Sequence, residues 1–340
     1  MINRDDNPIF LNDFLDYTKT ILNKSSNTIK EYNYDIAHFL KFISYRFRNT
    51  HIDNYPEDIK TIEIKDMELN TIEKITLQDI HAFLAYLKDN YNSKAATLAR
   101  KTASIRVFFN YLCNKMKWIK TNPAQDLESP KLDRRLPKYL TLDESKELLN
   151  TAQNPTIEEG KFKGHGNHNN SERDFAIITL LLNCGMRLSE LTGINISDIN
   201  YQDKLLTVIG KGNKERTIYL NDACINAIKR YMAVRPKDGV KFDSRDALFL
   251  SEQKKRISNR TVQYIIKNEL HLAGIKKADT YSVHKLRHTA ATLMYKYGNV
   301  DIRALQELLG HESIATTQIY THVDNDQVRH AVESNPLAKM

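Results

Sequence analysis

Cysteine is scarce in this 340-residue chain, which contains only Cys113, Cys184 and Cys224. These residues lie far apart and form no Cys-x-x-Cys pair, so their spacing argues against a zinc ribbon and against a disulfide framework. Each lies in an apolar or mixed segment. We therefore expect reduced, buried thiols, as is usual for a cytoplasmic protein.

Long apolar runs are also missing. No stretch approaches the roughly 18 consecutive apolar residues that a membrane span requires. The amino-terminal segment, residues 1–6, lacks the cationic-then-apolar plan of a signal peptide. There is no internal repeat, low-complexity tract or heptad array. We therefore expect a cytoplasmic protein with no membrane partner.

The composition is that of a globular protein with a basic balance. Hydrophobic residues make up 41% and charged residues 27% of the chain, both ordinary for a globular fold. Its length allows two domains, each with its own core. Lys and Arg total 50 against 42 Asp and Glu, a net charge of +8. This excess is compatible with a polyanionic partner, because binding phosphates releases counterions, but does not identify one.

The first third of the chain predicts helices. Ser25 precedes a segment whose apolar residues recur at intervals of three and four, which is typical of one helical face. These positions are Ile29, Tyr32, Ile36, Phe39, Leu40 and Ile43. A second helix is expected from Thr76 onward and a third through Leu98–Leu112. The polar segment 48–73 is compatible with either a loop or a short extra element.

Residues 129–138 contain two prolines and predict a linker between domains 1–128 and 139–340. Its four basic side chains could follow a DNA backbone or belong to a solvated hinge. Beyond it, Thr141 and Glu144 predict a capping box, and 153–172 a Gly/Asn/His-rich loop. β-Prone runs at residues 205–209 and 216–220 flank a basic glycine turn and predict a hairpin. We therefore expect a mainly α fold with a small β-sheet in two domains.

Two arginines are candidates for binding a phosphodiester. Arg187 lies in Cys184–Leu191, placed by the pattern just inside a helix start, and Arg287 lies in His284–Thr289. Guanidinium groups offer paired donors to non-bridging oxygens and stabilise a pentacoordinate transition state. Either arginine alone would more commonly be a surface residue, so the hypothesis depends on their occurring together with the residues below.

Proton transfer needs further side chains. Lys211, in the predicted hairpin turn, could protonate a departing 5′ oxygen, with Lys214 as the alternative. His284 would share a helical face with Arg287 and could bind the phosphate or accept a proton, and His311 could donate to a non-bridging oxygen. A metal site using His284, His288 and His311, or His165 and His168, lacks a paired carboxylate or cysteine set. The spacing therefore predicts no metal site.

Tyr320 is the candidate nucleophile. Its phenol has an unperturbed pKa near 10, so neighbouring cations and a base must favour ionisation during attack. The chain has 17 tyrosines, and only position singles out Tyr320. It follows Gly310–His311 near the end of the chain, as Ile319–Tyr320–Thr321–His322.

These motifs, in this order, closely resemble those of the tyrosine recombinase (phage integrase) family, most of all its Xer-type members. The resemblance spans roughly residues 140–325, with a looser helical match before the linker. It implies a catalytic set of Arg187, Lys211, His284, Arg287, His311 and Tyr320, with Glu190 and His288 in supporting positions. It also implies a C-shaped clamp on double-stranded DNA, with residues 1–128 as a helical core-binding domain and 139–340 as a catalytic domain with a carboxyl-terminal tail. Segments 48–73 and 153–172 make the chain longer than a compact Xer protein.

The resemblance further implies site-specific cleavage and rejoining of DNA through a 3′-phosphotyrosyl intermediate, with no cofactor needed. Four protomers on two sites would form a homo- or hetero-tetramer and exchange strands through a Holliday junction, and the tail after Tyr320 could dock on a neighbouring protomer. Xer-like resolution of chromosome or plasmid dimers is the function implied. Integration or excision of a mobile element, a type IB topoisomerase and a non-catalytic DNA-binding regulator are the alternatives. The target sequence, and any need for a sister recombinase or DNA translocase, stay open.

Overall fold

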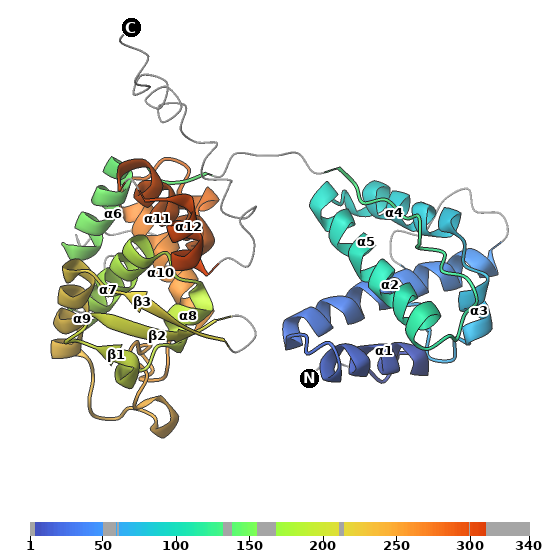
Figure 1. Ribbon diagram of the computed structural model, residues 1–340, viewed down its shortest axis with the longest axis horizontal. Coiled ribbons are helices and arrows are strands. Elements are labelled where there is room, and N and C mark those ends of the chain that lie inside the picture. Colours follow the sequence, from blue (N-terminus) through green and yellow to red (C-terminus); the bar gives the residue numbers. More distant parts are fainter. Residues whose placement is uncertain are drawn as a thin grey trace, which may run out of the picture. The chain divides into compact units, whose positions relative to one another are not determined.

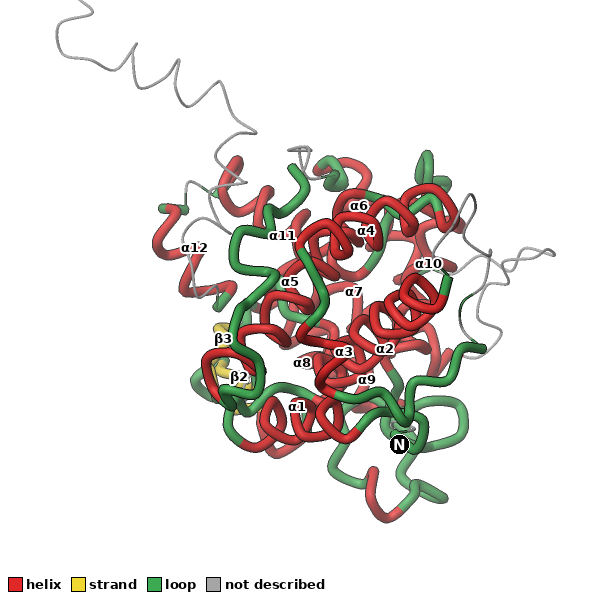
Figure 2. The backbone as a smooth tube through the Cα atoms, turned by 90° about the vertical axis from the view of Figure 1, so that its right-hand side faces the viewer, coloured by secondary structure: helices red, strands yellow, loops and turns green. Residues whose placement is uncertain are grey.

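The computed structural model of the chain describes residues 4–49, 59, 61–131, 138–154, 168–210, 214–298 and 300–310. The chain divides into two compact units, Met1–Arg134 and Arg135–Met340 (Figure 1). Helices dominate both units, and the strands gather in one small sheet in the second (Figure 2). This confirms the predicted mainly α fold with a small β-sheet. Most of the expected linker, residues 132–137, lies outside the described residues.

Two helices of the first unit begin where the sequence predicts them, α2 after the predicted cap Ser25 and α4 after Thr76. Ser25 accepts a hydrogen bond from the Thr28 amide at the start of α2, and Thr76 and Asp79 form a capping box at the start of α4. The described elements are α1 (Ile9–Thr20), α2 (Ser26–Arg48), α3 (Leu69–Glu73), α4 (Leu77–Tyr91), α5 (Ala95–Asn110) and a π-helical turn, η1 (Tyr111–Lys115). The third predicted helix is thus confirmed as far as Asn110, where the π-helical turn takes over.

The core of the first unit is rich in aromatic rings. Phe14 and Phe108 pack edge to face with ring centroids 5.3 Å apart, and five of the six predicted apolar positions of α2 are buried. The segment 48–73 also contributes. It contains α3, and its residues Ile59, Ile64 and Ile72 are buried in this core. The described part of the segment is therefore a packed element of the unit.

The second unit is built around α7. Its described helices are α6 (Leu142–Gln153), α7 (His168–Cys184), α8 (Leu188–Gly193), α9 (Asp222–Val234), α10 (Asn259–Leu272), α11 (Val283–Tyr297) and α12 (Ile302–Leu309), with short 3-10 turns at Ile196–Asp198, Phe242–Ser244 and Ala278–Thr280. Helices α6, α9, α10 and α11 all contact α7 (Figure 1). The predicted capping box of Thr141 and Glu144 is confirmed at the start of α6.

The prediction of a loop over residues 153–172 is wrong at both ends. Gln153 is the last residue of α6, and residues 168–172 form the first turns of α7. The physical reason is tertiary contact: Ser171 and Glu172 are buried, and Glu172 pairs with Arg230 of α9 at 2.7 Å. Such contacts override a polar local composition. Residues 155–167 lie outside the described residues.

The sheet is antiparallel, with strand order β1 (Ile199–Asn200), β2 (Leu205–Ile209), β3 (Glu215–Tyr219). The predicted hairpin is confirmed with its second strand one residue earlier, whereas the two-residue β1 was not foreseen. Leu206 pairs with Ile218 and Val208 with Arg216. Because strand side chains alternate between faces, Arg216 lies on the same face of the sheet as the buried Ile218.

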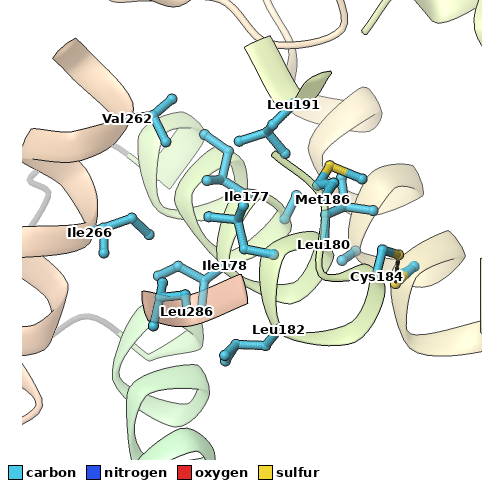
Figure 3. Close-up of a cluster of buried hydrophobic side chains, with 14 of the residues drawn as sticks. Ile177, Ile178, Leu180, Leu182, Cys184, Met186, Leu191, Val262, Ile266 and Leu286 are labelled. Atoms are coloured by element: carbon cyan, nitrogen blue, oxygen red, sulfur yellow. Dashed lines mark hydrogen bonds between the residues drawn. The ribbon is translucent and has the colours of Figure 1, made fainter. Parts of the chain in front are cut away.

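A cluster of apolar side chains joins the helices of the second unit (Figure 3). Ile177, Ile178 and Leu180 of α7 are buried with Met186 and Leu191, which lie on either side of Arg187. Fully burying each such side chain contributes roughly 1.5–3 kcal/mol. Leu286 of α11 belongs to the same cluster. The core thus holds both segments that carry the candidate arginines.

All three cysteines are described, and none forms a disulfide. Cys184 and Cys224 are buried with their sulfur atoms 3.7 Å apart, whereas Cys113 is half-buried. The expectation of buried thiols therefore holds for two of the three. Among the described helices, none has both the length and the apolar character to cross a bilayer.

Candidate active site

Arg187 stands at the junction of α7 and α8. After α7 ends at Cys184, Gly185 adopts φ +57°, and Arg187 takes an extended conformation as the N-cap residue of α8. The sequence pattern placed it just inside the helix, and the structure places it one residue earlier. A side chain at position 185 would be strained and would put its Cβ 3.0 Å from Leu309. The glycine therefore permits the close approach of α12.

Glu190 binds two arginines at once. Its carboxylate is fully buried and accepts four hydrogen bonds. Two come from Arg187, through the backbone N–H at 2.7 Å and Nη1 at 2.8 Å, and two from Arg216, through Nη2 at 2.9 Å and Nε at 3.3 Å. Burial alone would raise the pKa of Glu190, but hydrogen bonds from Arg216 and Arg187 outweigh it and lower the pKa below its ordinary value. The carboxylate is therefore ionised at neutral pH.

Arg287 extends from α11 into the interior of the unit and is only 3% exposed. Its Nη1 donates to the carbonyl oxygen of Gly185 at 2.8 Å, and its Nη2 donates to that of Leu309. It therefore joins α11 to the segment before Arg187 and to the end of α12. Arg187 is more accessible, with 32% of its side chain exposed.

Two histidines of α11 pack against each other. The rings of His284 and His288, one helical turn apart, meet edge to face with centroids 4.4 Å apart. Burial, then Arg287 and Arg187, lower the pKa of His284. Burial, then His284, Arg287 and Lys285, lower the pKa of His288 to about 4. Both rings are therefore neutral at pH 7, which leaves His284 able to accept a proton.

The end of α12 connects three arginines. The carbonyl oxygens of three consecutive residues, Leu308, Leu309 and Gly310, accept hydrogen bonds from Arg216, Arg287 and Arg187 respectively. Carbonyls at a helix carboxyl end lack intrahelical partners and carry partial negative charge, so cations stabilise them. Gly310 adopts φ +61° and closes the helix. Segments from four parts of the sequence thereby meet at one point.

The structure thus brings together three of the six predicted catalytic residues: Arg187 and Arg287 bind adjacent carbonyls at the end of α12, and His284 lies three residues before Arg287 on α11. Lys211, His311 and Tyr320 lie outside the described residues. The hairpin that contains Lys211 is closed by a 2.7 Å hydrogen bond from the Gly210 amide to the Lys214 carbonyl. His311 directly follows Gly310 in the sequence. The catalytic roles of all six residues stay predictions.

Arg216 was not predicted as a site residue, although the sequence places it in the basic motif after Lys211. Its signal was a cation on the inner face of a strand that otherwise buries apolar residues, opposite Val208. A charged side chain there requires a partner, and the structure supplies Glu190. For metals, no group of three or more His, Cys, Asp or Glu side chains within the described ranges could hold an ion.

Comparison with known proteins identifies the family. The model of the phage integrase family matches residues 138–327, and that of the phage integrase N-terminal SAM-like domain matches residues 48–115. Tyrosine recombinase XerC of Caldanaerobacter subterraneus subsp. tengcongensis is 53% identical over 332 residues, which cover 98% of this chain and 88% of that protein. Tyrosine recombinase XerC of Thermodesulfovibrio yellowstonii is 33% identical over 338 residues, 97% of each chain.

Solved structures share the fold. The XerH site-specific recombinase bound to a palindromic difH substrate, in a post-cleavage complex, aligns with a TM-score of 0.70 and 20% identity over 95% of this chain and 84% of that one. The Tn1549 transposon integrase in complex with circular intermediate DNA aligns with a TM-score of 0.66 and 19% identity over 96% of this chain and all of that one, 100%. The chain therefore belongs to the phage integrase family and is a tyrosine recombinase, an enzyme that cleaves and rejoins DNA at specific sites.

Proposed function

We propose that this recombinase resolves dimers of a chromosome or plasmid, as an Xer-type enzyme, with Tyr320 as its nucleophile. The observation that carries the catalytic assignment is the convergence of Arg187 and Arg287 on the end of α12, immediately before His311. The 53% identity to a XerC protein over 98% of the chain supports the Xer-type role.

The arginines would act on the scissile phosphate. Their guanidinium donors would bind its non-bridging oxygens, and the charge would stabilise the pentacoordinate transition state. Arg187 is held by Glu190 and Gly310 but keeps an exposed face, so a phosphate can approach it. His311 would add a third donor to the same oxygens.

Proton transfer completes the reaction. The Tyr320 oxygen forms a bond to phosphorus as the bond from phosphorus to the 5′ oxygen breaks. His284, neutral at pH 7, would accept the phenol proton, and Lys211 would give a proton to the leaving oxygen. The products are a 3′-phosphotyrosyl ester and a 5′ hydroxyl. Attack by the hydroxyl of a partner strand reverses these steps, and the ester conserves the bond energy for rejoining.

The assembly in this proposal is a homo- or hetero-tetramer on two double-stranded DNA sites. Residues 1–128 form the core-binding domain, 129–138 the linker and 139–340 the catalytic domain with its tail. Two solved structures of related fold, XerH and the Tn1549 integrase, were determined in complex with DNA, which supports DNA as the partner. A sister recombinase and a DNA translocase are the partners to be tested.

The proposal is tested by capturing covalent adducts. Wild type and the Tyr320→Phe variant are incubated with fragments of the genomic DNA, and SDS-resistant protein–DNA adducts are recovered and sequenced. We expect adducts at a discrete site with wild type and none with Tyr320→Phe. Tyr219→Phe is the matched control, since Tyr219 is 82% exposed on β3 and its variant should form adducts as wild type does.

The captured sequence separates the remaining functions. One chromosomal or plasmid site supports dimer resolution, whereas sites at the ends of a mobile element would replace it by integration or excision. DNA binding without adducts, where a control recombinase forms them, would contradict the catalytic proposal and favour a regulator. Adducts that persist in Tyr320→Phe would assign the nucleophile to another tyrosine.

A further inference from the structure

Arg216 connects three parts of the candidate active site although it lies outside the predicted catalytic set. It begins on β3, binds both carboxylate oxygens of Glu190, and donates through Nη1 to the carbonyl oxygen of Leu308. Its side chain is 16% exposed. An arginine presents its donors in a rigid planar fork, so the positions of these partners depend on one another.

The first connection runs to Arg187. Each oxygen of Glu190 accepts from both Arg187 and Arg216. If Arg216 were removed, the buried carboxylate would have Arg187 as its remaining cationic partner among the described residues. Its negative charge would then fall on Arg187 alone. Since Arg187 must present positive charge to a phosphate, this loss would weaken transition-state stabilisation.

The second connection runs to the end of α12. The Arg216 bond to Leu308 precedes, by two residues, the Arg187 bond to Gly310. A Cβ on Gly310 would lie 3.2 Å from Cδ of Arg216 and 3.7 Å from Nη1 of Arg187, so both arginines lie at contact distance from this turn. The Arg216 side chain thus sets the path of the backbone from which residue 311 continues.

We propose that Arg216 is a positioning residue for strand cleavage, which orients Arg187 through Glu190 and the backbone before His311 through Leu308. This inference rests on the proposed function and adds a residue to it. Arg216 itself need not touch the phosphate. A misplacement of the groups it holds is sufficient to slow the reaction, since an error of about 1 Å in catalytic geometry can cost about 100-fold.

The experiment uses the full-length chain and a nicked duplex that carries the captured site. After cleavage the short fragment with the 5′ hydroxyl diffuses away, so the phosphotyrosyl adduct cannot be religated and accumulates. Two versions of the scissile group are compared: the natural phosphodiester and a methylphosphonate. In the methylphosphonate a methyl group replaces one non-bridging oxygen, so the reacting group is neutral and depends less on arginine charge. The variants are Arg216→Ala, Arg216→Lys, Arg187→Ala and the double variant that combines Arg187→Ala with Arg216→Ala, with rates normalised to folded protein.

For Arg216→Ala we expect a loss of about 100-fold on the phosphodiester and less than about 10-fold on the methylphosphonate. Arg187→Ala should show the same preference, and the double variant should be little slower than Arg187→Ala alone, because the two residues act together. Arg216→Lys keeps the charge but loses the fork, so we expect an intermediate loss of about 10-fold on the phosphodiester.

Arg235→Ala is the matched control. Arg235 is also buried and also binds backbone carbonyls, those of Leu248, Arg245 and Ala247, none of which belongs to the candidate site. The Arg235→Ala variant should lower thermal stability and change the cleavage rates of the two substrates by the same factor. Equal losses on both substrates for Arg216→Ala, rates like wild type, or the same substrate preference in Arg235→Ala would each overturn the positioning role. Absence of adducts from wild type would instead overturn the proposed function, and the positioning role with it.

Discussion

The guanidinium of Arg187 donates a 2.7 Å hydrogen bond to the carbonyl oxygen of Gly310, 123 residues later in the chain. Glu190 holds the same guanidinium from the other side through Nη1. One arginine is thus oriented by a neighbour on its own helix and by a residue from a distant segment. A substitution at Gly310 should therefore change the orientation of the Arg187 side chain.

Gly310→Ala should lower the rate of DNA cleavage. The left-handed backbone, φ +61°, makes a Cβ costly by about 1–2 kcal/mol, and that Cβ would press on Arg216 at 3.2 Å. Gly274→Ala is the control, since Gly274 has φ +64° but no described atom within 4 Å of its Cβ. Adduct formation and thermal unfolding are measured for both. Comparable stability loss with slower cleavage only in Gly310→Ala is expected; equal cleavage in the two would contradict the link.

Lys211→Ala should slow cleavage by about 10²–10⁴-fold, the usual contribution of a general acid. A substrate with sulfur in place of the bridging 5′ oxygen should restore most of the rate, because a thiolate leaves without protonation. Lys214→Ala serves as the comparison and should be little affected on either substrate. If the sulfur-containing substrate instead restores the cleavage rate of Lys214→Ala, then Lys214 is the residue that protonates the leaving oxygen.

The stability of the second unit should fall as the pH drops from about 6.5 toward 4. His288 has a folded pKa of about 4, against about 6.5 for an unperturbed histidine. Between these values the unfolded chain binds the proton and the folded chain does not, so acid favours unfolding. His288→Asn should flatten the pH dependence in part, since His284, whose pKa is also lowered, stays. Urea unfolding at several pH values, followed by circular dichroism, measures this; an unchanged slope would contradict the assignment.

Asp35→Asn should destabilise the first unit strongly. Asp35 is fully buried and binds Lys101, only 4% exposed, at 2.9 Å. Leaving that ammonium without its carboxylate should cost about 3–5 kcal/mol. Lys101→Met should cost less, because Arg100 and Ser104 still satisfy Asp35. The fluorescence of Trp118, the single tryptophan, reports on this unit alone.

A surface ion pair supplies the control for this change. Asp16 pairs with Arg4 at 2.6 Å but is 60% exposed, so Asp16→Asn should cost no more than about 1 kcal/mol. If Asp35→Asn and Asp16→Asn lowered the free energy of unfolding by similar amounts, burial would not determine the strength of the pair between Asp35 and Lys101.

Local signals in the sequence located most of the elements. The caps at Ser25 and Thr141, the helix start at Thr76 and the hairpin around Gly210 follow from side chains within a few residues of each other, and all are confirmed. The helices α1, α9 and α10 were not predicted individually, and two further features were missed because they carry little local signal. The two-residue β1 is too short for a periodic pattern, and the first turn of α7 is polar and depends on contacts with other helices.

The candidate site also divides into residues with a local sequence signal and residues whose contacts are distant in the chain. Arg187, His284 and Arg287 could be predicted because they lie in recognisable motifs. For Arg216 the sequence signals only that a partner is needed and not which one, because Glu190 and Leu308 lie 26 and 92 residues away. No pattern over a short window reports such bonds. The shift of Arg187 from the first helical residue to the N-cap is equally a matter of tertiary structure, since Gly185 must turn to receive Arg287 and Leu309.

The three carbonyls at the end of α12 also fix the order in which the candidate site is assembled during synthesis. A ribosome makes residues 187, 216 and 287 before it makes 308–310, so a nascent chain carries the arginines without the oxygens that orient them. The groups that orient the three arginines are therefore made after the arginines themselves. A polypeptide released early, before α12, would retain most of its hydrophobic core and yet lack the carbonyl oxygens that hold the three arginines.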